Sequence, residues 1–218
     1  MKKIPKKLAI IDVMLCLIAL FILLEVIFHG YLTSIDLKVN ASMPTVHNTF
    51  FFSIAKIIDT FFDTTPILIL ALILAIVVWF RYSKKEALFF ASTMIVDAAV
   101  IVLLKILIHR PRPANALIIA NDYAFPSGHA VTSIVFFGLI AYMLLRNVKL
   151  VKLDAFKSAI IKGIIIGVTA AIIIVIDFSR IYLNIHWLSD VLGGLAIGAV
   201  ILTTSIILQQ TIDSKFLE

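Results

Sequence analysis

Three short stretches of the sequence combine basic side chains with histidine. They contain Lys105 and Arg112, then Ser127, Gly128 and His129, and then Arg180, His186 and Asp190. Cations that gather at one point repel each other unless an anion joins them, and the planar guanidinium of arginine matches two phosphate oxygens at once. Each cation alone is also typical of an anchor to lipid headgroups. All three beside two histidines favour a phosphate-binding site instead.

His186 and Asp190 are four residues apart and therefore share a face of a helix. A carboxylate can accept the Nδ1 proton of an imidazole, which leaves Nε2 unprotonated, as a nucleophile requires. An ordinary helical pair and a metal site are the alternatives, since histidine and aspartate are common metal ligands. The neighbouring cations would repel a metal ion, so we expect His186 to act as a nucleophile without a metal or cofactor.

The pair Ser127 and Gly128 stands directly before an apolar run and predicts the start of a helix. Ser127 can cap this helix, and Gly128 allows a ligand to approach the backbone closely. Free N–H groups at a helix start bind phosphate well. A simple cap without a ligand is the alternative, but His129 in the next position favours a binding site.

The composition indicates a membrane protein. Hydrophobic residues make up 62% of the 218 residues and charged residues 15%, whereas soluble domains have roughly 45–50% and about 25%. The net charge of +6 comes from basic residues in loops between apolar runs, which favours membrane orientation over nucleic-acid binding. No linker-like stretch occurs, so we expect residues 1–218 to form a single membrane-embedded domain. The one cysteine, Cys16, excludes an intrachain disulfide.

Six apolar runs approach the length of about 20 residues that a bilayer-spanning helix needs. They cover residues 8–29, 66–80, 87–108, 130–145, 163–178 and 187–208. The first follows four lysines, as a signal peptide would, but it is long for one and lacks a cleavage site. The shorter run 50–62 carries Lys56 and Asp59. We therefore predict an all-α polytopic membrane protein with six transmembrane helices and a short interfacial helix in the first outer loop.

The distribution of basic residues predicts the orientation. Six spans place both termini on one side, and 13 of the 19 Lys and Arg residues fall on that side. Cytoplasmic loops carry the excess of positive charge. Both termini are therefore expected in the cytoplasm of this multi-pass cell-membrane protein, and residues 109–128 and 180–186 on the extracytoplasmic face.

The motifs resemble those of a known family. Lys105-x6-Arg112-Pro113, Pro126-Ser127-Gly128-His129 and Ser179-Arg180-x5-His186-x3-Asp190 together look like the three signature motifs of the type 2 phosphatidic acid phosphatases. Every motif position is matched. The family includes soluble vanadium haloperoxidases, but the apolar spans resemble its membrane phosphatase branch. The resemblance implies metal-independent hydrolysis of a lipid phosphate or polyprenyl diphosphate through a phosphohistidine intermediate.

The resemblance and the residue types assign the same roles. His186 attacks phosphorus, Asp190 orients it, and His129 protonates the departing oxygen and then activates water. The phosphate oxygens are expected to bind Lys105, Arg112, Ser127, Gly128 and Arg180. Arg110 is expected at lipid headgroups or substrate, because the motif spacing favours Arg112.

Other functions remain open at this point. Asp97 and Asp177, two acids within or near apolar spans, would suit a transporter or flippase. If their roles are structural instead, we expect Asp97 to pair with another helix and Asp177 to pair with Arg180. A non-catalytic lipid-phosphate binder has no use for the pair of His186 and Asp190. Phosphotransfer to an alcohol would use the same intermediate. Phosphatidylglycerophosphate, phosphatidic acid and polyprenyl diphosphates are all possible substrates.

Overall fold

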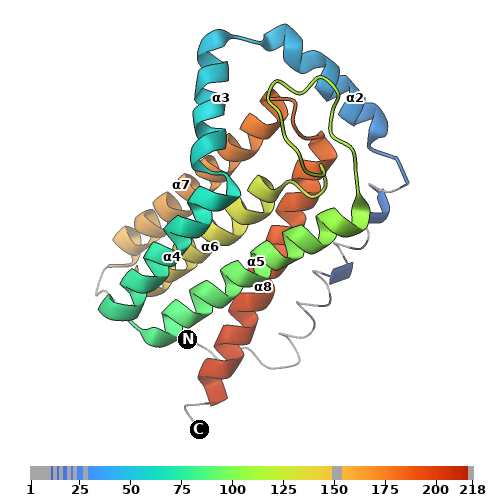
Figure 1. Ribbon diagram of the computed structural model, residues 1–218. Helices are drawn as coiled ribbons and strands as arrows, with labels where there is room; N and C mark the ends of the chain where they lie inside the picture. The colour runs from blue at the N-terminus through green and yellow to red at the C-terminus, as the bar shows by residue number, and fades with distance from the viewer. Residues whose placement is uncertain are drawn as a thin grey trace.

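The computed structural model describes residues 29–148 and 154–215, together with positions 11, 14, 17, 18, 21 and 24–26. Every regular element in these residues is a helix (Figure 1). The elements are α2 (Thr33–Ser42), the 3-10 helix η1 (Met43–Val46), α3 (Thr49–Phe61), α4 (Thr64–Arg81), α5 (Lys84–Ile108), α6 (Gly128–Val148), α7 (Ala155–Tyr182) and α8 (Leu188–Lys215). The predicted all-α class is confirmed for this part of the chain. The predicted span 8–29 lies largely outside the described residues.

Four of these helices, α5, α6, α7 and α8, are long and apolar enough to cross a membrane. Helices α3 and α4 meet at a bend of 51° and would add a fifth span if they are counted as one broken helix. The predicted interfacial run 50–62 lies in α3, and the predicted span 66–80 lies in α4. Helix α7 starts eight residues before the predicted span. Asp154 caps it there by accepting the N–H of Lys157 at 2.8 Å.

Helix α6 lies at the centre of the bundle and packs against α8, α7 and α5. Its side chains Val131, Val135, Phe136 and Leu139 are fully buried, and the Phe136 ring meets Phe90 of α5 edge to face at 6.0 Å. Helix α7, in contrast, exposes large aliphatic side chains along most of its length. Such a surface is stable where lipid replaces water.

Helices α2 and α3 stand at one end of the bundle, beside the loop between α5 and α6 and the connection between α7 and α8 (Figure 1). Asn48 starts α3 by accepting the N–H of Phe50 at 2.8 Å. Its own N–H donates to the hydroxyl of Tyr182 at the end of α7, at 2.8 Å. These contacts attach the segment that contains α2 and α3 to the end of the bundle where the sequence motifs lie.

Glycine allows α6 and α8 to approach closely. A Cβ atom at Gly194 would lie 2.8 Å from the carbonyl oxygen of Ser127, and one at Gly198 would lie 2.7 Å from that of Val131. Small residues at such positions let two membrane helices come into backbone contact. The contact also fixes the start of α6 against α8.

The close approach predicts that Gly198→Ala destabilises the protein. The added methyl group meets a backbone carbonyl that cannot move without displacing α6, and such overpacking costs about 1–3 kcal/mol. Thermal unfolding in detergent should show a lower midpoint. Gly167→Ala on α7 is the matched control, because nothing lies within 4 Å of its Cβ position. Equal midpoints for the two variants would show that the α6–α8 contact tolerates a side chain.

Candidate active site

The three motif stretches converge at one end of the bundle. Six of the eight predicted site residues line one cavity of about 590 Å³, namely Lys105, Arg112, Gly128, His129, Arg180 and His186. The other two, Ser127 and Asp190, are fully buried, and the N–H of Ser127 donates to the carbonyl of Asp190 at 3.2 Å. Lys105 and Arg180 come from the last turns of α5 and α7. His129 belongs to the first turn of α6, and His186 lies in the connection before α8.

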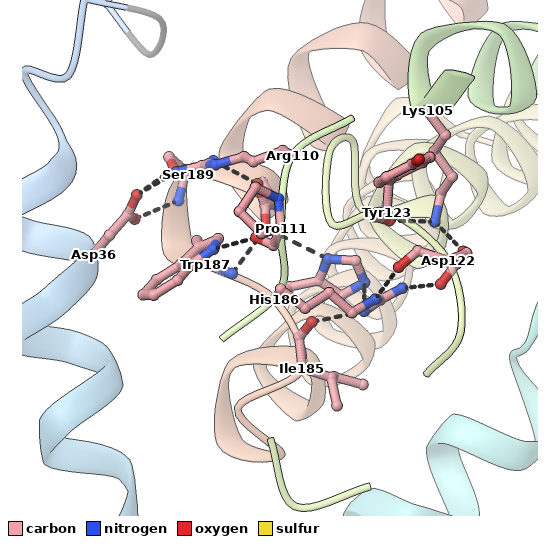
Figure 2. Close-up of polar contacts among 12 residues, drawn as sticks. Asp36, Lys105, Arg110, Pro111, Asp122, Tyr123, Ile185, His186, Trp187 and Ser189 are labelled. Carbon is pink, nitrogen blue, oxygen red and sulfur yellow. Dashed lines mark hydrogen bonds and ion pairs between the residues drawn. The ribbon is translucent and has the colours of Figure 1, made fainter. Parts of the chain in front are cut away.

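His186 is enclosed and has a defined orientation. Its Nε2 lies 3.1 Å from Nη1 of Arg112 (Figure 2). A guanidinium can only donate, so Nε2 must be the acceptor and the ring proton belongs on Nδ1. This tautomer is the one that the predicted nucleophile requires.

The contact between His186 and Asp190 is longer than predicted. Nδ1 lies 3.6 Å from Oδ2 of Asp190, which is beyond hydrogen-bond length. Oδ2 accepts the N–H of Trp187 at 2.9 Å, and Oδ1 accepts Nη1 of Arg110. The expected hydrogen bond is therefore not formed here, and each oxygen accepts a hydrogen bond from another donor instead. The carboxylate still faces the correct nitrogen.

Burial lowers the pKa of His186 well below the usual value of 6.5. The positive charges of Arg112, Arg180 and Lys105 lower this pKa further. Both effects disfavour the protonated ring. His186 is therefore neutral, and its Nε2 lone pair is available, at neutral and mildly acidic pH.

Two carboxylates contact the three cations of the cavity. Asp122, in the loop between α5 and α6, pairs with both Lys105 and Arg112 (Figure 2). Asp59 of α3 pairs with Arg180. Burial alone would raise the pKa of Asp122, but the hydrogen bonds and charges of Lys105 and Arg112 bring it below its usual value. Each cation of the cavity thus has a carboxylate partner.

Backbone carbonyls orient the cations further. Arg112 donates from Nη1 to the carbonyl of Ile185 at 2.6 Å and from Nε to that of Asp122 at 2.9 Å. Lys105 donates to the carbonyl of Tyr123 at 2.9 Å. These bonds aim both side chains into the cavity.

His129 lies beside α3. Its Nε2 is 3.4 Å from the carbonyl oxygen of Asp59 and 3.9 Å from Oδ1 of the same residue. His129 and His186 line the same cavity, His129 from the first turn of α6 and His186 from the connection before α8.

The structure corrects two expectations for the phosphate-binding groups. Ser127 does not cap α6, because its buried hydroxyl has no hydrogen-bond partner among the described residues. Arg180 pairs with Asp59 and not with Asp177, whose Oδ2 lies 3.5 Å from the hydroxyl of Ser133. The hydroxyl of Ser127 and the buried Nε of Arg180, which also lacks a partner there, are both donors suited to an anion.

Two further residues have contacts that their neighbours in the sequence do not reveal. Arg110 does not face lipid headgroups but bridges Asp190 and Asp36 of α2. The one sequence feature that points to Arg110 is its position two residues before Arg112. Asp36 has no local signal, since its partners lie 74 and 153 residues away.

The intramembrane acid Asp97 pairs with another helix, as expected. Oδ2 accepts the hydroxyl of Thr132 on α6 at 2.8 Å, and the residue lines the deep part of the cavity. Across the described residues, no group of three or more His, Cys, Asp or Glu side chains is arranged to hold a metal ion.

Comparison with known proteins identifies relatives. Over 99 residues the chain is 32% identical to phosphatidylglycerophosphatase B of Bacillus subtilis (strain 168), covering 45% of each protein. Over 94 residues it is 26% identical to lipid phosphate phosphatase delta of Arabidopsis thaliana, covering 43% of this chain and 21% of the relative. The alignments thus span less than half of either relative.

A solved structure and a family model agree with these relatives. The crystal structure of a transmembrane PAP2-type phosphatidylglycerolphosphate phosphatase from Bacillus subtilis has the same fold, with a TM-score of 0.77 at 22% identity. The match covers 93% of this chain and 96% of the solved one. The model of the PAP2 superfamily matches residues 86–213, which contain all three motifs. The chain therefore belongs to the PAP2 superfamily, the family that its motifs resemble.

Proposed function

We propose that this protein hydrolyses a lipid phosphate or lipid diphosphate through a phosphohistidine intermediate at the extracytoplasmic face of the membrane. One observation carries the proposal: Nε2 of His186 is an acceptor that opens onto a cavity lined by Lys105, Arg112 and Arg180. A neutral imidazole next to three cations is arranged to attack an anion. The names of the relatives, both phosphatases of lipid phosphates, support the same activity.

The first step transfers the phosphoryl group to the enzyme. The phosphate oxygens replace Asp122 and Asp59 on the cations, and Nε2 of His186 forms a bond to phosphorus. The bond from phosphorus to the leaving oxygen breaks, and His129 donates a proton to that oxygen. Asp190, facing Nδ1, stabilises the positive charge that the ring then carries.

The second step releases phosphate. His129, now neutral, removes a proton from water, and the water oxygen attacks phosphorus. The bond between phosphorus and Nε2 breaks, which restores neutral His186 and frees inorganic phosphate. Lysine and arginine stabilise the negative charge in both steps, so the proposed mechanism uses neither a metal ion nor a cofactor.

The proposed orientation agrees with the positions of the charged residues. Arg81, Lys84 and Arg146 lie at the ends of α4, α5 and α6 that are remote from the cavity. An excess of such residues is typical of the cytoplasmic side. We place six spans in the single domain 1–218, with both termini in the cytoplasm and the cavity outside.

The cavity also suits a lipid. From the cations it continues along α5 past Ile101 and Val102 and reaches Leu68 of α4. Val102 is 57% exposed and Leu68 is 38% exposed at the surface of the bundle. A lipid tail entering between α4 and α5 would leave its phosphate at the cations. Phosphate release from phosphatidylglycerophosphate, phosphatidic acid and a polyprenyl diphosphate should identify the preferred substrate.

The proposed nucleophile predicts that His186→Ala lowers turnover by about 10⁴-fold or more. Phosphate-labelled substrate followed by an alkaline quench should trap phosphohistidine on the parent protein and none on the variant. His29→Ala is the control, because His29 is exposed and its ion pair is with Glu25 of its own segment. Turnover or labelling that persists in His186→Ala would refute the assignment.

The lowered pKa of His186 predicts a pH dependence. Because the neutral ring persists below pH 6.5, the acidic limb of kcat/KM that arises from His186 should lie below that value. Arg112→Gln removes a neighbouring positive charge, raises the pKa of His186, and should move this limb to higher pH. Arg146→Gln, at the opposite end of α6, is the control, because its pH profile contains any limb caused by ionisation of the substrate while the charges around His186 are unchanged. A limb that stays in place or moves to lower pH in Arg112→Gln contradicts the explanation.

Competition between Asp122 and phosphate predicts that Asp122→Asn binds inorganic phosphate more tightly. The side chain of Asp122 is 55% exposed, and ion pairs of this kind contribute about 0.2–1 kcal/mol. The inhibition constant for phosphate should therefore fall by up to about 5-fold. Asp154→Asn, which alters an exposed pair with Lys157, should change nothing. Weaker inhibition would mean that Asp122 mainly positions Lys105 and Arg112.

A further inference from the structure

A carboxylate from the first outer segment caps the helix that carries Asp190. Asp36 of α2 is buried, with 3% of its surface exposed. Its Oδ1 accepts the N–H of Ser189 at 2.9 Å, and its Oδ2 accepts the Ser189 hydroxyl. Ser189 is the second residue of α8, so Asp36 satisfies a free N–H group at the positive end of this helix.

Arg110 connects this carboxylate to Asp190. Its Nη2 donates to Oδ2 of Asp36 at 2.9 Å, and its Nη1 donates both to Oδ1 of Asp190 and to the Ser189 hydroxyl, the latter at 2.7 Å. Figure 2 shows Asp36, Ser189 and Arg110 joined on the side of the site away from Lys105 and Asp122. The planar guanidinium has donors in a fixed fork, which allows it to hold two carboxylates at once.

These contacts fix the geometry of Asp190. The Trp187 N–H holds one oxygen and Arg110 holds the other. The carboxylate therefore cannot rotate without losing a buried hydrogen bond, which is costly. Its position 3.6 Å from Nδ1 of His186 depends on where Arg110 stands, and Asp36 determines where Arg110 stands.

The negative charge beside His186 depends on Asp36, Arg110 and Asp190 together. Arg110 alone would neutralise Asp190, and Asp190 would then do little for a positive imidazole. With Asp36 included, two carboxylates share one guanidinium, so the group keeps a negative charge beside His186. Without Arg110, the two buried carboxylates would repel each other.

We propose that Asp36 and Arg110 are positioning residues that set Asp190 against His186. The inference rests on the proposed phosphohistidine chemistry. It assigns a function to the segment containing α2, which lies outside the residues matched by the family model. Neither residue touches the cations that receive the phosphate, so their effect should appear in the chemical step and not in phosphate binding.

The first test separates these two effects. Asp36→Asn removes the charge but keeps the size, and residues that orient a metal-binding histidine in a comparable way contribute about 10–100-fold to activity. We expect kcat to fall within this range, while the inhibition constant for inorganic phosphate changes less than about 2-fold. Asp154→Asn is the matched control, since Asp154 also caps a helix start, that of α7. Unchanged kcat in Asp36→Asn, or an equal loss of phosphate binding, overturns the proposal.

The second test examines the pathway of the effect. If Asp36 acts through Arg110, Asp36→Asn should cost less than about 3-fold in a protein that already carries Arg110→Gln, because coupled residues are not additive. Arg110→Lys, which keeps the charge but not the fork, should retain more activity than Arg110→Gln. Losses that simply multiply in the double variant would show that the two residues act separately.

If Asp36→Asn does not fold, Ser189→Ala provides a second test. This variant removes the hydroxyl that bridges Asp36 and Arg110 but keeps the hydrogen bond from the Ser189 N–H to Asp36. A lower kcat with unchanged phosphate inhibition then supports the proposal, and unchanged kcat overturns it. Turnover of lipid phosphate by the parent protein is measured alongside. Its absence would refute the proposed function and the inference together, whereas a fully active Asp36→Asn variant would refute only the positioning role.

Discussion

Three cations held in one cavity at the end of an apolar bundle impose the main constraint on this structure. Lys105, Arg112 and Arg180 come from α5, the loop after it and α7, and burying them together is unfavourable unless anions join them. Asp122 pairs with Lys105 and Arg112, and Asp59 pairs with Arg180. Two further carboxylates, Asp63 and Asp97, line the same cavity. In the proposed reaction a phosphate replaces Asp122 and Asp59 on the cations, so the groups that stabilise the cavity are also the groups proposed to bind the substrate.

His186 stands between this positive group and a negative one. On the side of Nε2 lies Arg112, and on the side of Nδ1 lies Asp190 with its partners Arg110 and Asp36. The two fields favour one tautomer, with the proton on Nδ1 and the lone pair of Nε2 directed at the cavity. The orientation of the proposed nucleophile thus follows from charges contributed by α2, the loop after α5 and α8, which only the complete bundle brings together.

Local residue types predicted which side chains gather at one cavity, but they could not predict the long-range contacts of those side chains. Lys105, His129, Arg180 and His186 stand at or beside helix ends, so hydropathy and spacing sufficed to place them on one side, and the motifs predicted the family correctly. The partners Asp36 and Asp59 could not be found, because each lies on a separate helix far away in sequence. Spacing cannot show which arginine of the run turns toward α8, so the sequence predicts lipid headgroups or substrate as the partners of Arg110. The sequence also predicts too late a start for α7, because the lysines within this helix are typical of a loop.

The most direct test is a structure of the protein with bound vanadate, which mimics five-coordinate phosphorus. We expect a bond from vanadium to Nε2 of His186 and oxygens on Lys105, Arg112 and Arg180, with Asp122 and Asp59 displaced from these cations. Vanadate bound elsewhere, or bound in the cavity with both carboxylates still on the cations, would contradict the account.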